Sequence, residues 1–328
     1  MSDALVSPPV FILTGAVSLA LLGTAVWKVK RERNDRPANG REREHLLPLM
    51  GVMGAFIFAA QMINFSIPGT GSSGHLVGGI LLAAILGPWA GLLTLASVLV
   101  IQCLLFADGG FMALGCNILN MAVLSCLVAY PLVFRPLMKP NASAARILTA
   151  SLLASVVSLE LGAAAVTLET ELSDITALPT GRFLLFMLPI HLVIGIGEGL
   201  ATAAVIGVVQ RYKPELLAEA ATQPAPGRRK LGKALAVIAL AALLIGGSFS
   251  WLASSKPDGL EWSIEKVTGG TDLEAAEEGL HGTSARIQQT TALMPDYDTS
   301  LAGIIGSGAI LAAVFGASYL MRAGQKQP

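Results

Sequence analysis

The chain alternates long, uninterrupted apolar runs with polar connections. About 20 apolar residues are enough for an α-helix to cross the hydrocarbon core of a bilayer. A membrane β-barrel would instead show segments of about ten residues with alternating polarity. The runs therefore predict membrane-spanning helices at Pro9–Val29, Leu46–Phe65, Ile118–Phe134, Ile147–Leu168, Phe183–Val209, Ala234–Ala253 and Leu301–Met321.

A further apolar stretch, Leu76–Phe106, is too long for one ordinary span and is interrupted at Gly87-Pro88. Proline lacks a backbone donor and biases the residue before it away from the helical conformation. We therefore predict two helices here, Leu76–Leu86 and Trp89–Phe106. Because the first is short for a membrane crossing, we expect other parts of the protein to cover it.

Lysine and arginine gather in alternate connections between the runs. The basic connections are Lys28–His45, Arg135–Arg146, Arg211–Lys233 and the tail that begins at Arg322. Since connections rich in Lys and Arg stay in the cytoplasm, this pattern predicts nine passages, with the N-terminus outside and the C-terminus inside. The first run is too long for a signal peptide and has no basic start, so we expect it to be a retained span.

Composition supports a membrane protein and gives its organisation. Hydrophobic residues make up 53% of the 328 residues and charged residues only 13%, which is too little polar surface for a water-soluble globule. Lys+Arg 22 balance Asp+Glu 22, so no basic field suggests nucleic acid as a partner. We expect an all-α polytopic membrane protein: a seven-passage body at 1–211, a cytoplasmic linker at 212–233 and a two-helix accessory unit at 234–328. Its external loop, 254–300, is expected to be exposed and partly irregular.

The connection Gln61–Leu76 is rich in glycine and serine and faces outside in this topology. It ends at His75, and neutral imidazole is the commonest ligand of transition metals. A single loop histidine is more often solvated or hydrogen-bonded, so His75 alone supports a metal site weakly. Polar residues on the same side are expected to support such a site, mainly through hydrogen bonds: Asn64, Ser73, Gln102, Asn117 and Asn120.

Glu160, His191 and Glu198 are ionisable residues inside predicted spans, where burial in lipid is costly. Glu160 and His191 each lie about eight residues from the outer end of their helix, a depth of about 12 Å. They can pair if the two helices touch, and His191 shares a helix face with Glu198. This pattern favours a structural pair, and direct metal binding stays open as the alternative.

Motifs for nucleotide or peptide hydrolysis are absent from the sequence. It contains no P-loop, no H-E-x-x-H and no G-x-S-x-G. Active transport would therefore draw its energy from a partner or from an ion gradient. An intramembrane enzyme is disfavoured because no nucleophile–base or metal–base set is evident. The main rival to a metal-binding transporter subunit is a secondary cation transporter or channel that uses Glu160, His191 and Glu198 as an ion path.

An ordered series of motifs extends along the chain: Ser72–Gly79, Leu86–Gly91, Gln102–Phe106, Asp108–Gly110, Ala113–Gly115, Asn117–Met121 and His191–Gly199. Together they resemble the metal-binding membrane subunit of the cobalt/nickel energy-coupling factor transporters, the CbiM/NikM family, over roughly residues 1–211. The remainder, with Lys256–Glu261 just outside a span, resembles the small two-helix partner subunit (CbiN/NikN). The chain therefore looks like a natural fusion of the two.

The resemblance implies a set of nitrogen ligands for the transported metal. In the family these are the amino-terminal amine, the backbone nitrogen and imidazole of a histidine at the second position, and the histidine that matches His75. Here the amine would be that of Met1, and Ser2 stands where histidine is expected. We expect the natural start to lie about two residues earlier, at a Met-His. If Met1 is the true start, Ser2 supplies only its backbone nitrogen.

The resemblance also implies the substrate and the partners. Four nitrogens in a plane suit Ni(II), and related geometry serves Co(II). Co(II) or Ni(II) would be the transported substrate, with no organic cofactor. A separate transmembrane coupling subunit and cytosolic ATPase subunits would drive import, with the chain as a multi-pass protein of the bacterial inner membrane. The chain itself would be no enzyme.

Overall fold

The computed structural model describes residues 1–35, 46–139, 141–217, 238–240, 242, 244, 254–271, 273, 278–295 and 302–323. The linker 212–233 and the expected span Ala234–Ala253 lie largely outside these described residues. The body contains η1 (Asp3–Leu5), α1 (Pro8–Asp35), α2 (Leu46–Gln61), β1 (Phe65–Ile67), β2 (Ser72–Gly74), α3 (Gly79–Leu86), α4 (Pro88–Phe106), α5 (Leu114–Asn117), η2 (Ile118–Phe134), α6 (Arg135–Leu137), α7 (Ala144–Ser173), α8 (Thr180–Tyr212) and η3 (Pro214–Leu216). The later part contains α10 (Gly259–Thr268), α11 (Gly279–Thr291) and α12 (Ala302–Ala323).

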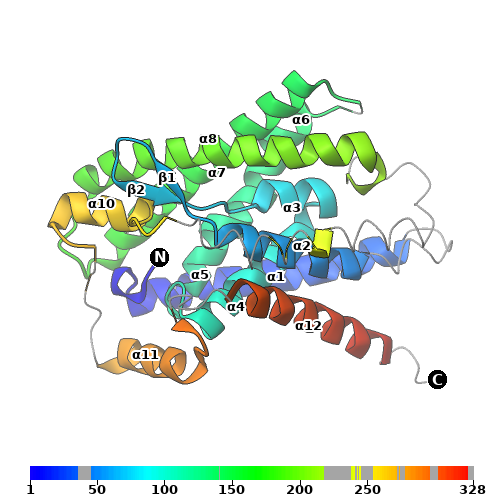
Figure 1. Ribbon diagram of the computed structural model, residues 1–328. Coiled ribbons are helices and arrows are strands. Elements are labelled where there is room, and N and C mark those ends of the chain that lie inside the picture. Colours follow the sequence, from blue (N-terminus) through cyan, green and yellow to red (C-terminus); the bar gives the residue numbers. More distant parts are fainter. Residues whose placement is uncertain are drawn as a thin grey trace.

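Long apolar helices lie side by side in a bundle (Figure 1). Within the described residues, five segments are long and apolar enough to cross a membrane: 8–32, α4, Leu114–Leu137, α7 and α8. Many leucines on these helices face outward, among them Leu153, Leu185 and Leu200, as on a surface that lipid covers. The chain is thus a helical membrane protein. The seven-passage body, the total of nine passages and the orientation of the termini stay predictions.

The predicted break at Gly87-Pro88 is confirmed. α3 ends at Leu86 and α4 begins at Pro88, with Gly87 between them at a φ of 86° that favours glycine. Every residue of α3 is buried, so protein covers the short helix on all sides, as expected. The break turns the chain back, and α3 packs on α4 and η2.

The helices α7 and α8 pack closely along their length, as the glycines of α8 suggest. A Cβ at Gly195 would come 2.9 Å from Cα of Val156, and a Cβ at Gly199 would come 2.6 Å from Cα of Leu152. Small residues let helix backbones approach in a membrane, where close packing drives association. α8 therefore has a fixed position in the bundle, and it carries His191 and Glu198.

Two segments differ from the sequence-based expectation. The Gly- and Ser-rich connection is not all coil: β1 and β2 form an antiparallel hairpin with Phe65 opposite Gly74, which adds a small sheet to the expected all-α fold. The external loop 254–300 contains two helices, α10 and α11, and each buries one side. Both helices pack on the body, a contact that no local pattern along the chain reveals.

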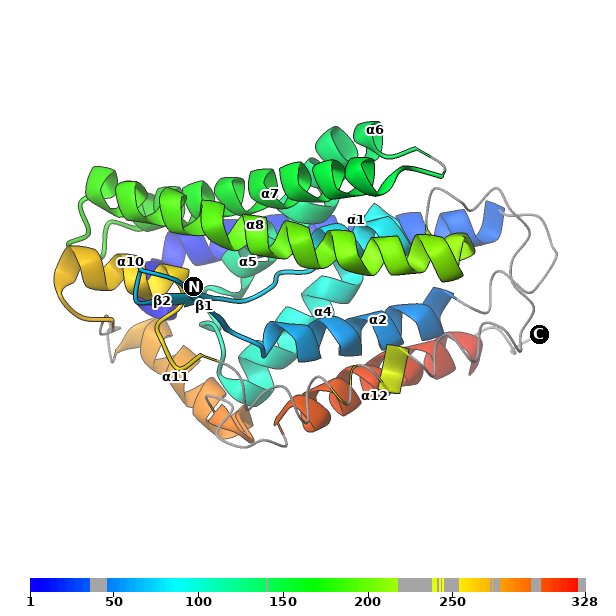
Figure 2. The same cartoon turned by 45° about the horizontal axis from the view of Figure 1, so that its top comes forward.

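The described ends of the helices that flank three basic connections lie at one end of the bundle. The end of α1, the turn between α6 and α7, and the end of α8 all lie away from the N-terminus, the hairpin and α10 (Figures 1 and 2). Lys30, Arg146 and Arg211 mark these three places. Lys30, Arg146 and Arg211 therefore lie at one end of the bundle and the candidate site lies at the other.

Candidate metal-binding site

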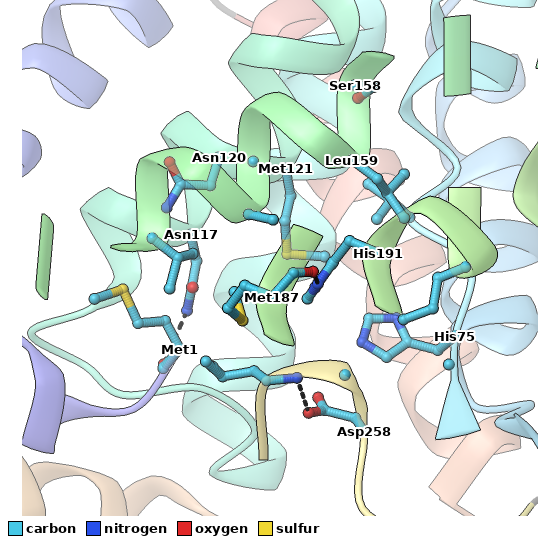
Figure 3. Close-up of a pocket in the computed structure, with 18 residues that line it drawn as sticks. Met1, His75, Asn117, Asn120, Met121, Ser158, Leu159, Met187, His191 and Asp258 are labelled. Carbon is cyan, nitrogen blue, oxygen red and sulfur yellow. Dashed lines mark hydrogen bonds between the residues drawn. The ribbon is translucent and has the colours of Figure 1, made fainter. Parts of the chain in front are cut away.

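A cavity of about 120 Å³ lies where the N-terminus, the β-hairpin and α10 meet the bundle. Its wall is formed by both parts of the chain, from Met1 to α10 (Figure 3). The wall residues with nitrogen, oxygen or sulfur in their side chains are Met1, His75, Asn117, Asn120, Met121, Ser158, Met187, His191 and Asp258. The fold thus brings Met1 and His75, two of the three expected ligand positions, to one space.

The amino-terminal segment is inserted into the body. Leu5 and Val6 have no exposed surface. The carbonyl oxygen of Met1 accepts hydrogen bonds from the backbone N–H of Gly110 (3.0 Å) and from Nδ2 of Asn117 (3.3 Å). These bonds hold Met1 at the cavity wall. One of them comes from Asn117, a residue that the sequence predicted to support the site.

Asp3 anchors the same segment on two sides. Its Oδ1 accepts a hydrogen bond from the backbone N–H of Ala113 (3.0 Å), and its Oδ2 accepts one from the hydroxyl of Ser284 in α11. The Asp3 side chain is therefore engaged in fastening the chain. The Ser2 side chain is exposed, and its carbonyl accepts a hydrogen bond from the backbone N–H of Leu5 (3.2 Å). Ser2 is not among the residues that line the cavity.

Helix α11 adds two further bonds to this end of the body. Nε2 of His281 donates to the carbonyl oxygen of Val6 (3.0 Å), and the His281 side chain is buried. Nε2 of Gln288 donates to the carbonyl oxygen of Gly109 (2.9 Å). The accessory unit thus contacts both the amino-terminal segment and the loop that holds it.

His75 follows directly on strand β2 and is partly buried. Gly74 lies hard against α8, since a Cβ there would come 2.6 Å from Cγ1 of Ile194. Nδ1 of His75 lies 3.3 Å from the carbonyl oxygen of Leu76. A carbonyl can only accept, so this contact favours the tautomer with a proton on Nδ1 and leaves Nε2 with a free lone pair.

The backbone after His75 is held from two directions. The Glu198 carboxylate accepts hydrogen bonds from the backbone N–H groups of Val77 (2.9 Å) and Gly78 (3.1 Å). Nε2 of Gln61 donates to the carbonyl oxygen of Val77 (2.9 Å), and Nε2 of Gln102 donates to Oε1 of Gln61 (2.9 Å). Gln102 therefore supports the loop after His75 indirectly, through the side-chain amide of Gln61.

Ser73 joins the hairpin to the accessory unit. Its backbone N–H donates to the carbonyl oxygen of Pro257 (2.8 Å), and its hydroxyl donates to that of Lys256 (2.8 Å). Nε1 of Trp262 in α10 donates to the carbonyl oxygen of Thr70 in the hairpin turn (2.9 Å). The hairpin and α10 consequently form one wall.

Pro257-Asp258-Gly259-Leu260-Glu261 begins α10 and shapes that wall. The Asp258 side chain accepts from the backbone N–H of Glu261 (2.9 Å), and the Glu261 side chain accepts from that of Asp258 (3.1 Å), which is a capping box. A Cβ at Gly259 would come 2.8 Å from Cδ1 of Ile194 and 3.1 Å from Cε1 of His191. Glycine thus lets the start of α10 approach α8 closely.

Two more of the expected supporting residues lie nearby. Nδ2 of Asn120 donates to Oε2 of Glu169 in α7 (2.6 Å), and both side chains are buried. Asn64 contributes its carbonyl oxygen, which accepts from the backbone N–H of Ser254 (2.8 Å). All five residues therefore make hydrogen bonds, with backbone or side chain. Of the five, Asn117 and Asn120 line the cavity, whereas Asn64, Ser73 and Gln102 do not.

Glu160, His191 and Glu198 have separate surroundings in place of the expected pair. Nδ1 of His191 lies 2.7 Å from the carbonyl oxygen of Met187, and the Glu198 carboxylate is bound to the loop after His75. Oε1 of Glu160 has no hydrogen-bond partner among the described residues. The reason is helical geometry: Ser158 faces the cavity, so Glu160, two positions on, points to another side of α7.

Sequence reasoning did not single out Gln61, Glu169, His281 or Gln288. Gln61 and Glu169 lie at the ends of apolar runs, where a polar residue is easily assigned to the adjoining loop. Their burial is the clue, and only the tertiary structure shows it. His281 and Gln288 belong to a segment whose helical form and contacts were not expected.

The donor atoms around the cavity define its chemistry. In the part of the chain that the structure describes, no three His, Cys, Asp or Glu side chains lie close enough to hold one metal ion. The imidazoles of His75 and His191 line the cavity together with Met1 at the amino terminus. Such ligands suit Co(II), Ni(II), Cu(II) and Zn(II) more than Mg(II) or Ca(II).

Comparison with known proteins identifies the same two parts. Residues 1–216 match the family described as CbiM, cobalt uptake substrate-specific transmembrane region, and residues 232–323 match the PDGLE domain. The fused nickel transport protein NikMN of Rhodobacter capsulatus is 31% identical over 353 residues, which cover 97% of this chain and 94% of that protein. The cobalt transport protein CbiM of Geobacter sulfurreducens is 28% identical over 287 residues, or 84% and 77% of the two chains.

Solved structures agree with these matches. A truncated transition metal transporter superposes with a TM-score of 0.53 at 28% identity and covers 65% of this chain and 98% of its own. A second transition metal transporter has the same TM-score and identity and covers 64% and 92%. The chain therefore belongs to the CbiM family of cobalt and nickel transport proteins and carries, after its CbiM region, a PDGLE domain like the fused NikMN proteins.

Proposed function

We propose that this chain is the substrate-binding membrane component of an energy-coupling factor transporter that imports Co(II) or Ni(II). The observation that carries the proposal is the cavity shared by Met1 and His75, which brings the amino terminus beside an imidazole. His75, the Met1 amine and the backbone nitrogen of Ser2 are the proposed ligands. Nitrogen donors of this kind match the metals in the names of the relatives.

The proposed organisation follows the two matched regions. Residues 1–211 form the metal-binding body, 212–233 form a cytoplasmic linker, and 234–328 form an accessory unit whose external part, 254–300, closes the cavity. The bonds from Ser73 to Lys256 and Pro257 support this role, since they join the body to the accessory unit beside His75.

The proposed energy source lies on other polypeptides. The sequence has no P-loop, so ATP hydrolysis would come from cytosolic ATPase subunits, joined to this chain by a transmembrane coupling subunit. The chain would act as a non-enzymatic subunit in a bacterial inner membrane.

Radioactive nickel or cobalt uptake in cells tests this proposal. We expect uptake by cells that express this chain to stop when the partner ATPase genes are deleted and to persist for several minutes in a proton ionophore. A secondary transporter would give the reverse result, with uptake that survives the deletion and collapses in the ionophore.

A further inference from the structure

A second histidine, His191, lines the cavity that holds His75 and Met1. It lies in α8, far from His75 in sequence, and the proposed ligand set does not use it. Figure 3 shows the two histidine side chains on the cavity wall, with Asp258 on another side of the same space. His191 can therefore have one of two roles: packing in the cavity wall, or binding the transported metal.

The packing places His75 beside the part of α8 that carries His191. Gly74, the residue before His75, lies against Ile194, one helical turn after His191. Gly259 presses on that same turn, with close approaches to both Ile194 and His191. The hairpin and α10 thus hold the two imidazoles beside each other.

Both imidazoles are prepared to bind a metal through Nε2. Nδ1 of His191 donates to the carbonyl oxygen of Met187 (2.7 Å), and Nδ1 of His75 lies 3.3 Å from that of Leu76. Histidines that bind metals commonly donate the other ring N–H to a carbonyl or carboxylate, which fixes tautomer and ring orientation. Nε2 of His191 has no hydrogen-bond partner in the described part of the chain.

The other two histidines are poor alternatives. Nε2 of His281 is engaged with the carbonyl oxygen of Val6 (3.0 Å), and His281 is absent from the cavity wall. His45 lies outside the described residues, in the basic connection Lys28–His45 that the sequence predicts on the cytoplasmic side. Asp258 adds a negative charge to the wall near His191, which favours a bound cation.

We propose that His191 is a second imidazole ligand, so that the transported divalent metal is held between Nε2 of His75 and Nε2 of His191. This rests on the proposed function and deepens it, because it adds an imidazole from α8 to the proposed ligands. Two neutral imidazoles select Co(II) and Ni(II) over Mg(II) and Ca(II).

Nickel X-ray absorption of the purified full-length chain, starting at Met1 and loaded with one equivalent of nickel sulfate in detergent, tests this. In this measurement, scattering from the outer atoms of the imidazole rings shows how many histidines bind the nickel ion. We expect two for the wild-type chain and one each for His191→Asn and His75→Asn, together with an affinity for nickel at least roughly tenfold weaker by calorimetry. Asparagine at position 191 can still donate to the Met187 carbonyl, so the substitution should preserve the fold. Circular dichroism checks the helix content of each variant.

His45→Asn serves as the matched control and should leave both the imidazole count and the affinity unchanged. A wild-type spectrum with one imidazole overturns the inference without any variant, and so does a His191→Asn protein with unchanged count and affinity. A wild-type protein that binds no nickel contradicts the proposed function as well, which separates the two failures.

Discussion

Glu198 in α8 accepts a hydrogen bond from the backbone N–H of Val77 (2.9 Å), two residues after His75. The Glu198 side chain is only 1% exposed, so this N–H and that of Gly78 replace water as its partners. Gln61 holds the carbonyl oxygen of Val77 from the other side. A buried ionisable side chain thus holds the backbone after His75. The sequence alone also left open a part for Glu198 in an ion path.

Glu198→Gln should weaken metal binding without abolishing it. Glutamine can accept from one N–H group, but its own amide opposes the other, and an unpaired buried donor costs about 1–3 kcal/mol. Loss of a group that orients a ligand typically lowers metal affinity by about 10- to 100-fold, so we expect a decrease near the lower end by calorimetry.

Glu160→Gln is the matched control, because Oε1 of Glu160 has no hydrogen-bond partner in the described residues. Its metal affinity should equal that of the wild type. Uptake lost in both Glu160→Gln and Glu198→Gln would favour the rival ion path.

His75→Ala should reduce metal uptake below detection while the protein still reaches the membrane. The substitution removes an imidazole at the end of β2, and the backbone bonds of Val77 and Gly78 remain to hold the loop. Uptake of radioactive nickel, normalised to the amount of protein in membranes, measures the effect. Uptake that matches His45→Ala would show that His75 is no ligand.

Gly259→Val should open the cavity and impair metal binding. A Cβ at this position already comes within 2.8 Å of Ile194 and 3.1 Å of His191, so a branched side chain must push α10 away from α8. Metal affinity should fall by roughly tenfold, by analogy with the loss of a group that orients a ligand.

Gly270→Val makes the same chemical change where nothing lies within 4 Å and should have no effect on affinity. Equal affinities of the two valine variants would show that close approach of α10 to α8 does not matter for the site. Calorimetry on both proteins in one detergent gives the comparison.

A chain with Met-His added before Met1 should bind nickel more tightly than the chain as printed. The added residues supply an amine, a backbone nitrogen and an imidazole together, and Met1 already lies at the cavity wall. Four nitrogens in a plane suit Ni(II). A Met-Ser extension of the same length is the control, and equal affinity of the two extended proteins would contradict a role for that imidazole.

The sequence by itself determined the membrane class, most helices and the motif-based family resemblance. Continuous apolar runs leave only the helix as a way to satisfy the backbone in lipid, so α1, α4, α7 and α8 follow directly from hydropathy. Gly87-Pro88 likewise fixed the break between α3 and α4, because proline and a positive φ act locally. His75 and the polar residues expected to support it were singled out as polar groups on one predicted side of the membrane. Four of these residues are buried in the structure: Ser73, Gln102, Asn117 and Asn120.

Only the tertiary structure decided which residues share the site. The partners of Val77 come from two helices, Gln61 from α2 and Glu198 from α8, and the second imidazole belongs to His191. The segments of the accessory unit that line the cavity lie far along the chain from the body. Local patterns record propensity and polarity along the chain, whereas hydrogen bonds and close packing between distant segments depend on how the whole bundle folds.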